Sequence, residues 1–255
     1  MTILNVSFNS LSGTIPESLA NTALVELIVS ANNMVGPFPA SLYGMKSLEH
    51  VCIDRNKFVA MPDWASMSNL KYIYAFENEI EGELDPAIGD LKNIEVIDVH
   101  QNKLTGALPK KWRNLKNLLK LKVSDNRLSG EVSDEIFGLP RLTELWLASN
   151  DFIGEIPSTI GELGSAWSSA GVVRGKYIRL ENNSFGGNVP KEIANIENLY
   201  FFSLESNNFS GEMPEEICAI PTITVSTNGY GLFKITSTCS QVDCSCLDVC
   251  ECIEK

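Results

Sequence analysis

The chain has 255 residues, of which 20 are Lys or Arg and 32 are Asp or Glu, giving a formal net charge of −12. This balance argues against nucleic acid and anionic membrane surfaces as partners, because both are bound by clustered Lys and Arg. No apolar run approaches the roughly 18 residues of a membrane span, so no membrane segment is expected. The N-terminus shows neither the basic region nor the apolar region of a signal peptide.

The chain is built from a repeat of about twenty-four residues. Leu142 to Pro157 reads LTELWLASNDFIGEIP, and the pattern returns in Leu118 to Val132 and in Leu199 to Pro214. Aligned on the motif asparagine, the repeats fall at Asn9, Asn32, Asn56, Asn78, Asn102, Asn126, Asn150, Asn183, Asn207 and, more weakly, Asn228. Such repeats form a solenoid, in which each unit buries its apolar face against its neighbours. Because the chain begins inside a repeat, we expect a fragment, a processed form or an incomplete gene product.

The motif predicts the structure of one coil. In a strand, side chains alternate, so Leu145 and Leu147 are expected to point inward while Glu144 and Trp146 point outward. The Asn150 amide is expected to bond the backbone of neighbouring coils, and stacking would turn these bonds into a ladder. The stretch PSTIGEL after the motif predicts a short helix or 3-10 turn on the opposite side.

The form of the motif carries a family resemblance. NSLSGTIP at Asn9 to Pro16 and NKLTGALP at Asn102 to Pro109 resemble plant-type leucine-rich repeats, which occur in receptor-kinase ectodomains and polygalacturonase-inhibiting proteins. The resemblance implies an α/β solenoid, a right-handed superhelix with a parallel sheet on its concave face and short helix or 3-10 segments on its convex face. It assigns residues 1–228 to about ten repeats, the first incomplete and with an insertion near 164–175, and residues 229–255 to a Cys-rich C-terminal cap.

The cysteines concentrate at the C-terminal end of the chain. Disulfide candidates are Cys218, Cys239, Cys244, Cys246, Cys250 and Cys252. An even cluster of this kind predicts disulfides and an oxidising compartment, and the tail resembles those of secreted diatom and algal leucine-rich-repeat proteins. Metal binding is the alternative, but the spacing lacks two-residue knuckles and nearby His. The expected location is secreted or at the cell surface. N-x-S sequons make Asn5, Asn182 and Asn208 glycosylation candidates.

Two departures from the repeat predict local irregularity. The third unit reads NKFVAMPDW and lacks the motif glycine, so its back is expected to be irregular. The insertion at Gly164 to Gly175 predicts a loop on the convex or lateral side. Trp167 in this loop is expected to pack onto the solenoid rather than to contact a partner.

The outward strand positions are the candidate binding surface, because the consensus leaves them free. Six, four and two residues before each motif asparagine they form three columns, expected to be solvated. Aromatic side chains there supply contact area at low entropic cost. We select Tyr72, Tyr74, Phe76, Asp98, His100, Lys122, Trp146, Tyr177, Arg179 and Phe201 as binding residues. The alternative is that a parallel sheet simply tolerates such residues on its surface.

The sequence therefore predicts a non-catalytic module that binds a protein or peptide, or a glycan, through the concave face, without a cofactor or metal. Inhibition of a secreted glycosidase is one alternative, by resemblance to polygalacturonase inhibitors, and ice binding is a weaker one because the columns are heterogeneous. His50, Cys52 and Asp54 share one strand, but their spacing of about 6.5 Å disfavours a nucleophile–base pair. Cys52 is expected to be a lone thiol, partly shielded by Tyr74.

Overall fold

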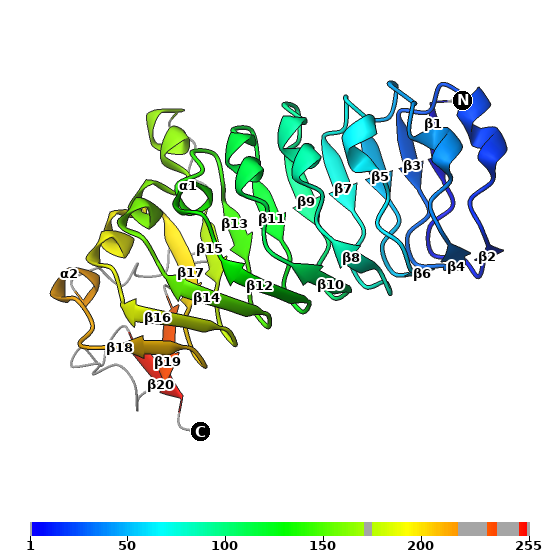
Figure 1. Cartoon of the computed structure of the whole chain (residues 1–255). Coiled ribbons are helices and arrows are strands. Elements are labelled where there is room, and N and C mark those ends of the chain that lie inside the picture. The colour runs from blue at the N-terminus through cyan, green and yellow to red at the C-terminus, as the bar shows by residue number, and fades with distance from the viewer. Residues whose placement is uncertain (1, 171–174, 219–233, 239–249, 254–255) are drawn as a thin grey trace, which may run out of the picture. The chain divides into compact units, whose positions relative to one another are not determined.

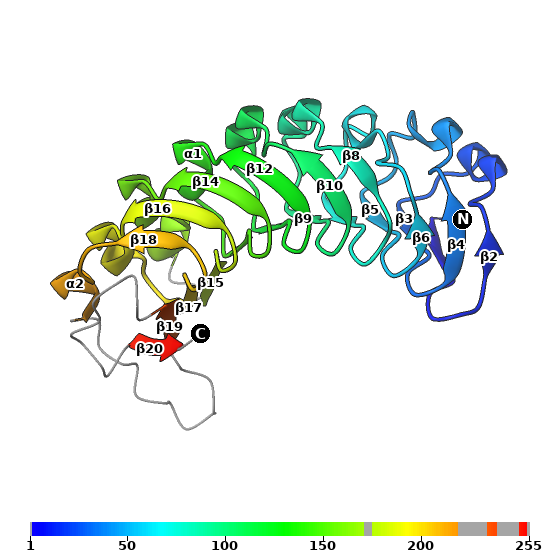
Figure 2. The same cartoon turned by 60° about the horizontal axis from the view of Figure 1, so that its bottom comes forward.

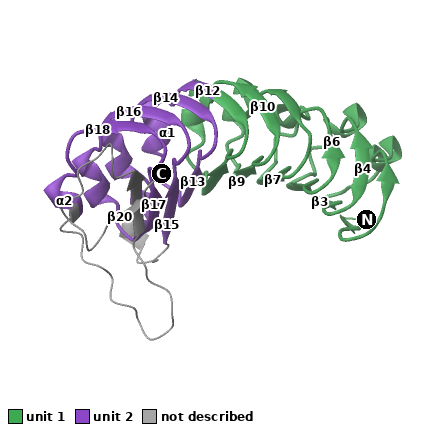
Figure 3. Cartoon of the chain, turned by 90° about the horizontal axis from the view of Figure 1, so that it is seen from below, with its two compact units in different colours: residues 1–128 green, residues 129–255 purple. Residues whose placement is uncertain are grey.

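The computed structural model describes residues 2–170, 175–218, 234–238 and 250–253, with the backbone alone for 168–170, 218 and the last two segments. It divides into two compact units, residues 1–128 (unit 1) and 129–255 (unit 2), shown in Figure 3. Each unit has its own main sheet strands, flank strands and short helices.

Unit 1 contains one parallel sheet with a single short strand from each coil (Figure 1). Its strands are β1 (Ile3–Asn5), β3 (Glu26–Ile28), β5 (His50–Cys52), β7 (Tyr72–Tyr74), β9 (Val96–Asp98) and β11 (Lys120–Lys122). The middle residue of each strand from β3 onward points inward and is at most 1% exposed, as at Leu27, Ile73 and Leu121. The alternation in the sequence therefore places the apolar residues in the core.

Smaller parallel sheets form the flank of unit 1 (Figure 2), which the repeat pattern did not predict. The flank strands are β2 (Ser12–Gly13), β4 (Asn33–Gly36), β6 (Lys57–Phe58), β8 (Glu81–Glu83), β10 (Lys103–Gly106) and β12 (Arg127–Glu131), the last of which contains the unit boundary. One sheet ends at β6 and another begins at β8. This break falls in the third repeat, which lacks the motif glycine, so the irregularity predicted there lies on the flank.

Short 3-10 helices form the third side of unit 1. They are η1 (Glu17–Asn21), η2 (Ala40–Leu42), η3 (Trp64–Ser66), η4 (Pro86–Asp90) and η5 (Lys110–Asn114). Pro16, Pro39 and Pro109 precede η1, η2 and η5, where their fixed φ suits the entry into a helix. Trp64 and Trp112 fill the core beneath their helices at no more than 1% exposure.

An asparagine ladder links successive coils, as predicted. Asn102 Nδ2 donates to Ala75 O of the preceding coil and to Val99 O and His100 O of its own coil, at 3.0–3.3 Å. Its Oδ1 accepts from Ile80 N at 2.9 Å. One side chain thus provides hydrogen-bond partners for four backbone groups that lie just outside the strands.

Unit 2 repeats this plan. Its main sheet contains β13 (Glu144–Trp146), β15 (Lys176–Arg179), β17 (Leu199–Ser203), β19 (Lys234–Thr238) and β20 (Cys250–Ile253), and its flank contains β14 (Asp151–Glu155), β16 (Ser184–Asn188) and β18 (Asn208–Ser210). The helices are α1 (Asp134–Phe137), η6 (Ser158–Glu162), η7 (Ser165–Ala170), η8 (Lys191–Asn195) and α2 (Glu215–Cys218). The flank requires glycine at Gly154, because φ is +92° and a Cβ atom would lie 3.1 Å from Glu131 Cγ.

The end of the repeat array differs from the sequence alignment. Phe201 on β17 pairs with Lys234 on β19, and β20 pairs with β19. The main sheet therefore continues into the segment predicted as a cap, while the weak repeat at Asn228 lies outside the described residues. The division at residue 228 remains a prediction. The solenoid with a parallel sheet and short 3-10 helices is confirmed.

Candidate functional site

The outward positions of the main strands form one surface in each unit, which we call the strand face of that unit. The strand register aligns the predicted columns, for example His50 beside Tyr72 in unit 1 and Glu144 beside Tyr177 in unit 2. The unit 1 strand face contains Tyr72, Tyr74, Phe76, Asp98, His100 and Lys122, and the unit 2 strand face contains Trp146, Tyr177, Arg179 and Phe201.

Several of these positions are buried by their neighbours, contrary to the expectation of a solvated surface. Asp98, selected as a contact residue, is only 5% exposed. In the column two residues before the asparagine, Asp54 and Glu181 are 6% and 5% exposed and Ser124 is 1% exposed. The selected aromatic residues are half-buried. Asp98 therefore supports its neighbours beneath the surface, and the rings provide the accessible area.

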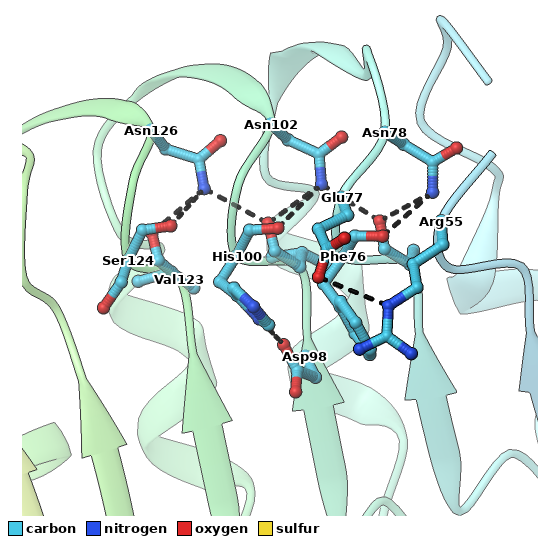
Figure 4. A network of polar contacts seen from close by, with 12 residues as sticks. Arg55, Phe76, Glu77, Asn78, Asp98, His100, Asn102, Val123, Ser124 and Asn126 are labelled. Carbon is cyan, nitrogen blue, oxygen red and sulfur yellow. Dashed lines mark hydrogen bonds and ion pairs between the residues drawn. The ribbon is translucent and has the colours of Figure 1, made fainter. Parts of the chain in front are cut away.

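A stacked cluster organises the unit 1 strand face (Figure 4). The Arg55 guanidinium lies 5.1 Å from the centre of the Phe76 ring, which stacks on the His100 ring at 4.6 Å with an interplanar angle of 12°. His100 Nδ1 lies 2.5 Å from Asp98 Oδ1, and Arg55 Nε donates to Glu77 Oε1 at 3.4 Å. Each ring is thus held between a charged partner and another ring.

A second arrangement fixes the other end of β7. The His50 and Tyr72 rings meet edge to face at 4.4 Å, and Tyr72 Oη donates to Glu95 Oε2 at 2.8 Å. This hydrogen bond to a carboxylate raises the pKa of the Tyr72 phenol, and burial adds to the effect. His50 Nδ1 lies 3.8 Å from Glu26 Oε1.

The chemistry of Cys52 is unsuited to nucleophilic catalysis. Burial, followed by the carboxylates of Asp54 and Glu26, raises the pKa of its thiol to about 12. The thiolate is the reactive form, and catalytic cysteines have lowered pKa values. Burial likewise raises the pKa of Asp54, which accepts a 2.5 Å hydrogen bond from Ser30 Oγ.

The unit 2 strand face is organised around Arg179. Its guanidinium lies 5.3 Å from the centre of the Trp146 ring. Arg179 Nε and Nη2 both donate to Glu181 Oε1, at 2.8 Å and 2.5 Å, and Glu181 Oε2 accepts from Ser203 Oγ. The Tyr177 ring lies 4.9 Å from that of Tyr200.

Sequence reasoning selected most of the rings but missed residues that hold them. Arg55 precedes the ladder asparagine, in a position whose φ is positive in every regular coil, and the column rule excludes that position. Tyr200 lies one residue before Phe201, the column residue of that coil, so the column rule excludes it as well. Glu181 was assigned to a column but not selected. The signal that identifies these residues is charge or aromatic character beside a selected residue, which lies in the adjacent coil for Arg55 and Tyr200 and in the same coil for Glu181.

Two family models of the leucine-rich repeat match the sequence, at residues 1–22 and 92–152. Receptor-like protein 31 of Arabidopsis thaliana is 32% identical over 89 residues, which cover 33% of the chain and 10% of that protein. Together with the stacked coils, these matches identify leucine-rich repeats in the chain. The repeats are similar to those of a plant receptor-like protein.

Solved structures resemble this leucine-rich-repeat chain over most of its length. The Arabidopsis receptor kinase HAESA, crystallised with the peptide hormone IDA and the co-receptor SERK1, superimposes with a TM-score of 0.78 at 24% identity. The ectodomain of GASSHO1/SCHENGEN3 from Arabidopsis thaliana, in complex with CASPARIAN STRIP INTEGRITY FACTOR 2, gives 0.76 at 26% identity. Each match covers 93% of the chain but only 38% and 30% of the respective structure, so the chain spans about a third of their length.

The remaining predicted sites of the leucine-rich-repeat chain fall in different places. Asn5, Asn182 and Asn208 are exposed, and their glycosylation stays a prediction. The disulfide candidates Cys239, Cys244 and Cys246 lie outside the described residues, as do the side chains of Cys218, Cys250 and Cys252. Trp167 packs as expected, because its Nε1 donates to Arg141 O at 2.8 Å and its ring lies 5.0 Å from the Arg141 guanidinium.

Membrane-spanning helices and metal-binding clusters are both absent from the described residues. No described helix combines the length and the apolar character that crossing a membrane requires. Within the same residues, no group of three or more His, Cys, Asp or Glu side chains is arranged to hold a metal ion.

Proposed function

We propose that this protein is a non-catalytic recognition module that binds a peptide or an extended protein segment through its strand faces. The observation that supports this proposal is the fixed placement of half-buried rings on both faces. Phe76 is held between Arg55 and His100, and Trp146 is held beneath Arg179.

Fixed rings favour binding for a physical reason. Association costs free energy for each side chain that becomes ordered, about 0.5–1.5 kcal/mol for flexible ones. Rings that are already ordered by neighbours avoid much of this cost while offering large apolar area. Trp and Tyr in such settings are enriched among the residues that dominate binding energy.

The comparisons support the class of partner. HAESA and GASSHO1/SCHENGEN3 are receptors of this fold that were crystallised in complex with partners, in the first case a peptide hormone and a co-receptor. We extend to this chain the binding of a peptide or protein and an extracellular or cell-surface location. The protonated thiol of Cys52 supports the non-catalytic assignment, since the strand-face cysteine lacks the thiolate that attack on a substrate requires.

The test is to replace one ring on each strand face. Partners captured by the intact protein from its native extracellular fluid are identified by mass spectrometry, and the affinity of a purified partner is measured by calorimetry. We expect the partner to contact at least one of these two rings. Tyr74→Ala or Trp146→Ala, whichever removes a contacted ring, should weaken binding at least about fivefold. Lys116→Ala, an exposed residue after η5, is the matched control. Unchanged affinity in a folded Tyr74→Ala/Trp146→Ala double variant would reject the proposal.

The two alternatives remain predictions without a specific observation in their favour. Inhibition of a glycosidase is tested against wall-degrading enzymes, and ice binding by an ice-recrystallisation assay. A regular column of small residues is needed for an ice face. The flank positions Glu83, Thr105 and Arg127, which are paired in register, do not provide one.

A further inference from the structure

The acidic residues of the chain are concentrated in unit 2. Residues 1–128 contain 14 acidic and 13 basic residues, a net charge of −1, while residues 129–255 contain 18 and 7, a net charge of −11. These two values account for the net charge of −12. Unit 2 therefore attracts cations and repels anions at long range, an effect that salt screens.

Arg179, the cation predicted to contact a partner, is already paired with a carboxylate of unit 2. Arg179 was selected as a residue that contacts a partner, yet two of its N–H groups donate to Glu181 Oε1. The Glu181 side chain is 6% exposed and also accepts from Ser203 Oγ. Because a carboxylate of the protein occupies the guanidinium, a carboxylate of the partner would have to displace it.

The other nearby cations are placed away from the centre of this face. Lys176 on β15 is 2% exposed, and burial lowers the pKa of its amine. Lys234 on β19 is paired in register with Phe201 on β17, and β19 lies on the side of β17 that is away from β13. Between β13 and β17, the described strand face of unit 2 thus presents rings and carboxylates, with Arg179 neutralised.

The rings provide sites for positive charge. Trp146, Tyr177, Tyr200 and Phe201 are all half-buried on or beside the unit 2 strand face. The face of an aromatic ring carries negative potential and attracts Lys and Arg side chains within about 6 Å of its centre. Arg179 above Trp146 shows this contact within the protein. Burial, the neighbouring Tyr200 and the negative charge of Glu144 raise the pKa of the Tyr177 phenol.

We infer that the unit 2 strand face, between β13 and β17, binds an extended peptide segment rich in Arg or Lys, with its cations seated on the rings of Tyr177, Tyr200 and Phe201. This inference rests on the proposed function and adds the chemical class of the partner. We expect no such preference in unit 1, because it is nearly neutral and its main strands include Lys120 and Lys122.

The experiment uses the full chain and three synthetic nine-residue peptides. One alternates Arg with Ser, the second replaces each Arg with neutral citrulline, and the third replaces it with Glu. Binding is measured by calorimetry at low and high salt. The Arg peptide is expected to bind at least about tenfold more tightly than the citrulline peptide, with weaker binding at high salt. Equal or tighter binding of the Glu peptide would overturn the inference.

Substitutions at Tyr177 locate the binding. Tyr177→Phe keeps the ring and is expected to retain affinity for the Arg peptide, whereas Tyr177→Leu keeps apolar area without a ring and is expected to lose about fivefold. Tyr43→Leu, at a ring that follows η2 in unit 1 and lies outside both strand faces, is the control and should leave affinity unchanged. If the Arg peptide binds every variant equally, its attraction is diffuse and the site is wrong. Failure here leaves the proposed function standing when the Tyr74 and Trp146 substitutions still weaken natural partner binding.

Discussion

Arg179 donates two hydrogen bonds to Glu181, and both bonds end on the same oxygen, Oε1. The pair lies on one strand face, where Arg179 side-chain exposure is 41% and that of Glu181 is 6%. The carboxylate therefore holds the guanidinium over Trp146 and cancels its charge at the surface. Arg179 would otherwise bind an anion, but with Glu181 beside it, it becomes part of a surface that favours cations.

The asparagine ladder is expected to dominate the stability of each coil. Asn102→Ala leaves three carbonyls and the Ile80 N–H without this partner, so we expect the free energy of unfolding to fall by at least about 2 kcal/mol. Urea unfolding measures the change. Asn69→Ala is the control, because this exposed side chain donates to Lys46 O at 2.7 Å outside the ladder, and its loss should cost less than about 1 kcal/mol. Equal losses of unfolding free energy in the two variants would show that a position in the ladder adds nothing to stability.

The same substitution is expected to have opposite signs at two alanines. Ala31 has φ +53°, a left-handed conformation that costs a non-glycine residue about 1–2 kcal/mol. Ala31→Gly should therefore raise the free energy of unfolding by about 0.5–1 kcal/mol, after the entropic cost of glycine. Ala40 begins η2 with ordinary φ, and Ala40→Gly should lower stability by a similar amount. Thermal and urea unfolding of both variants test this, and a loss of stability in each would contradict it.

The residues that the repeat dictates could be predicted from the sequence, since burial and ladder bonding recur in every coil. Leu145 and Asn102 are examples, and both have the expected roles. The extent to which neighbours cover an outward position could not be predicted. Asp98 faces outward, but its partner His100 and the stacked Phe76 belong to the same surface and leave it 5% exposed. Such coverage depends on side-chain conformations across several coils, which alternation does not specify.

The thiol of Cys52 is expected to react slowly. With its pKa raised from an ordinary 9.0 to about 12, the thiolate fraction at pH 8 is about 10⁻⁴ in the folded protein, compared with about a tenth after unfolding. Native alkylation by iodoacetamide, mapped by mass spectrometry, should therefore be at least about a hundredfold slower than alkylation in urea. Rapid native alkylation at pH 8 would show that the thiol is neither buried nor protonated.

The same pKa shift makes a prediction for alkaline pH. The folded state holds the Cys52 proton more tightly than the unfolded state, whose thiol has the ordinary pKa of 9.0. Unfolding then releases this proton above pH 9, so the contribution to stability is complete below pH 9 and is lost as the pH rises toward 12. Cys52→Ala removes the contribution. The difference in stability between the two proteins should shrink over this range, and a constant difference would contradict the assignment.

Glu181→Gln tests how the unit 2 strand face acquires its preference for peptides rich in Arg or Lys. The amide removes the charge opposite Arg179, and because Arg179 is 41% exposed and remains partly solvated, we expect a modest loss of about 1–2 kcal/mol in the free energy of unfolding.

The change in binding is the more telling consequence of the same substitution. Arg179 becomes able to receive a carboxylate, so affinity for the Glu peptide should rise about tenfold while affinity for the Arg peptide falls. Glu212→Gln, which removes an exposed charge of the same unit, controls for net charge and should change stability by less than about 0.5 kcal/mol. If both variants shift peptide preference equally, the net charge of unit 2 decides the preference. If only Glu181→Gln shifts it, the intramolecular pair with Arg179 decides it, because only there does the lost carboxylate expose a cation beside the rings.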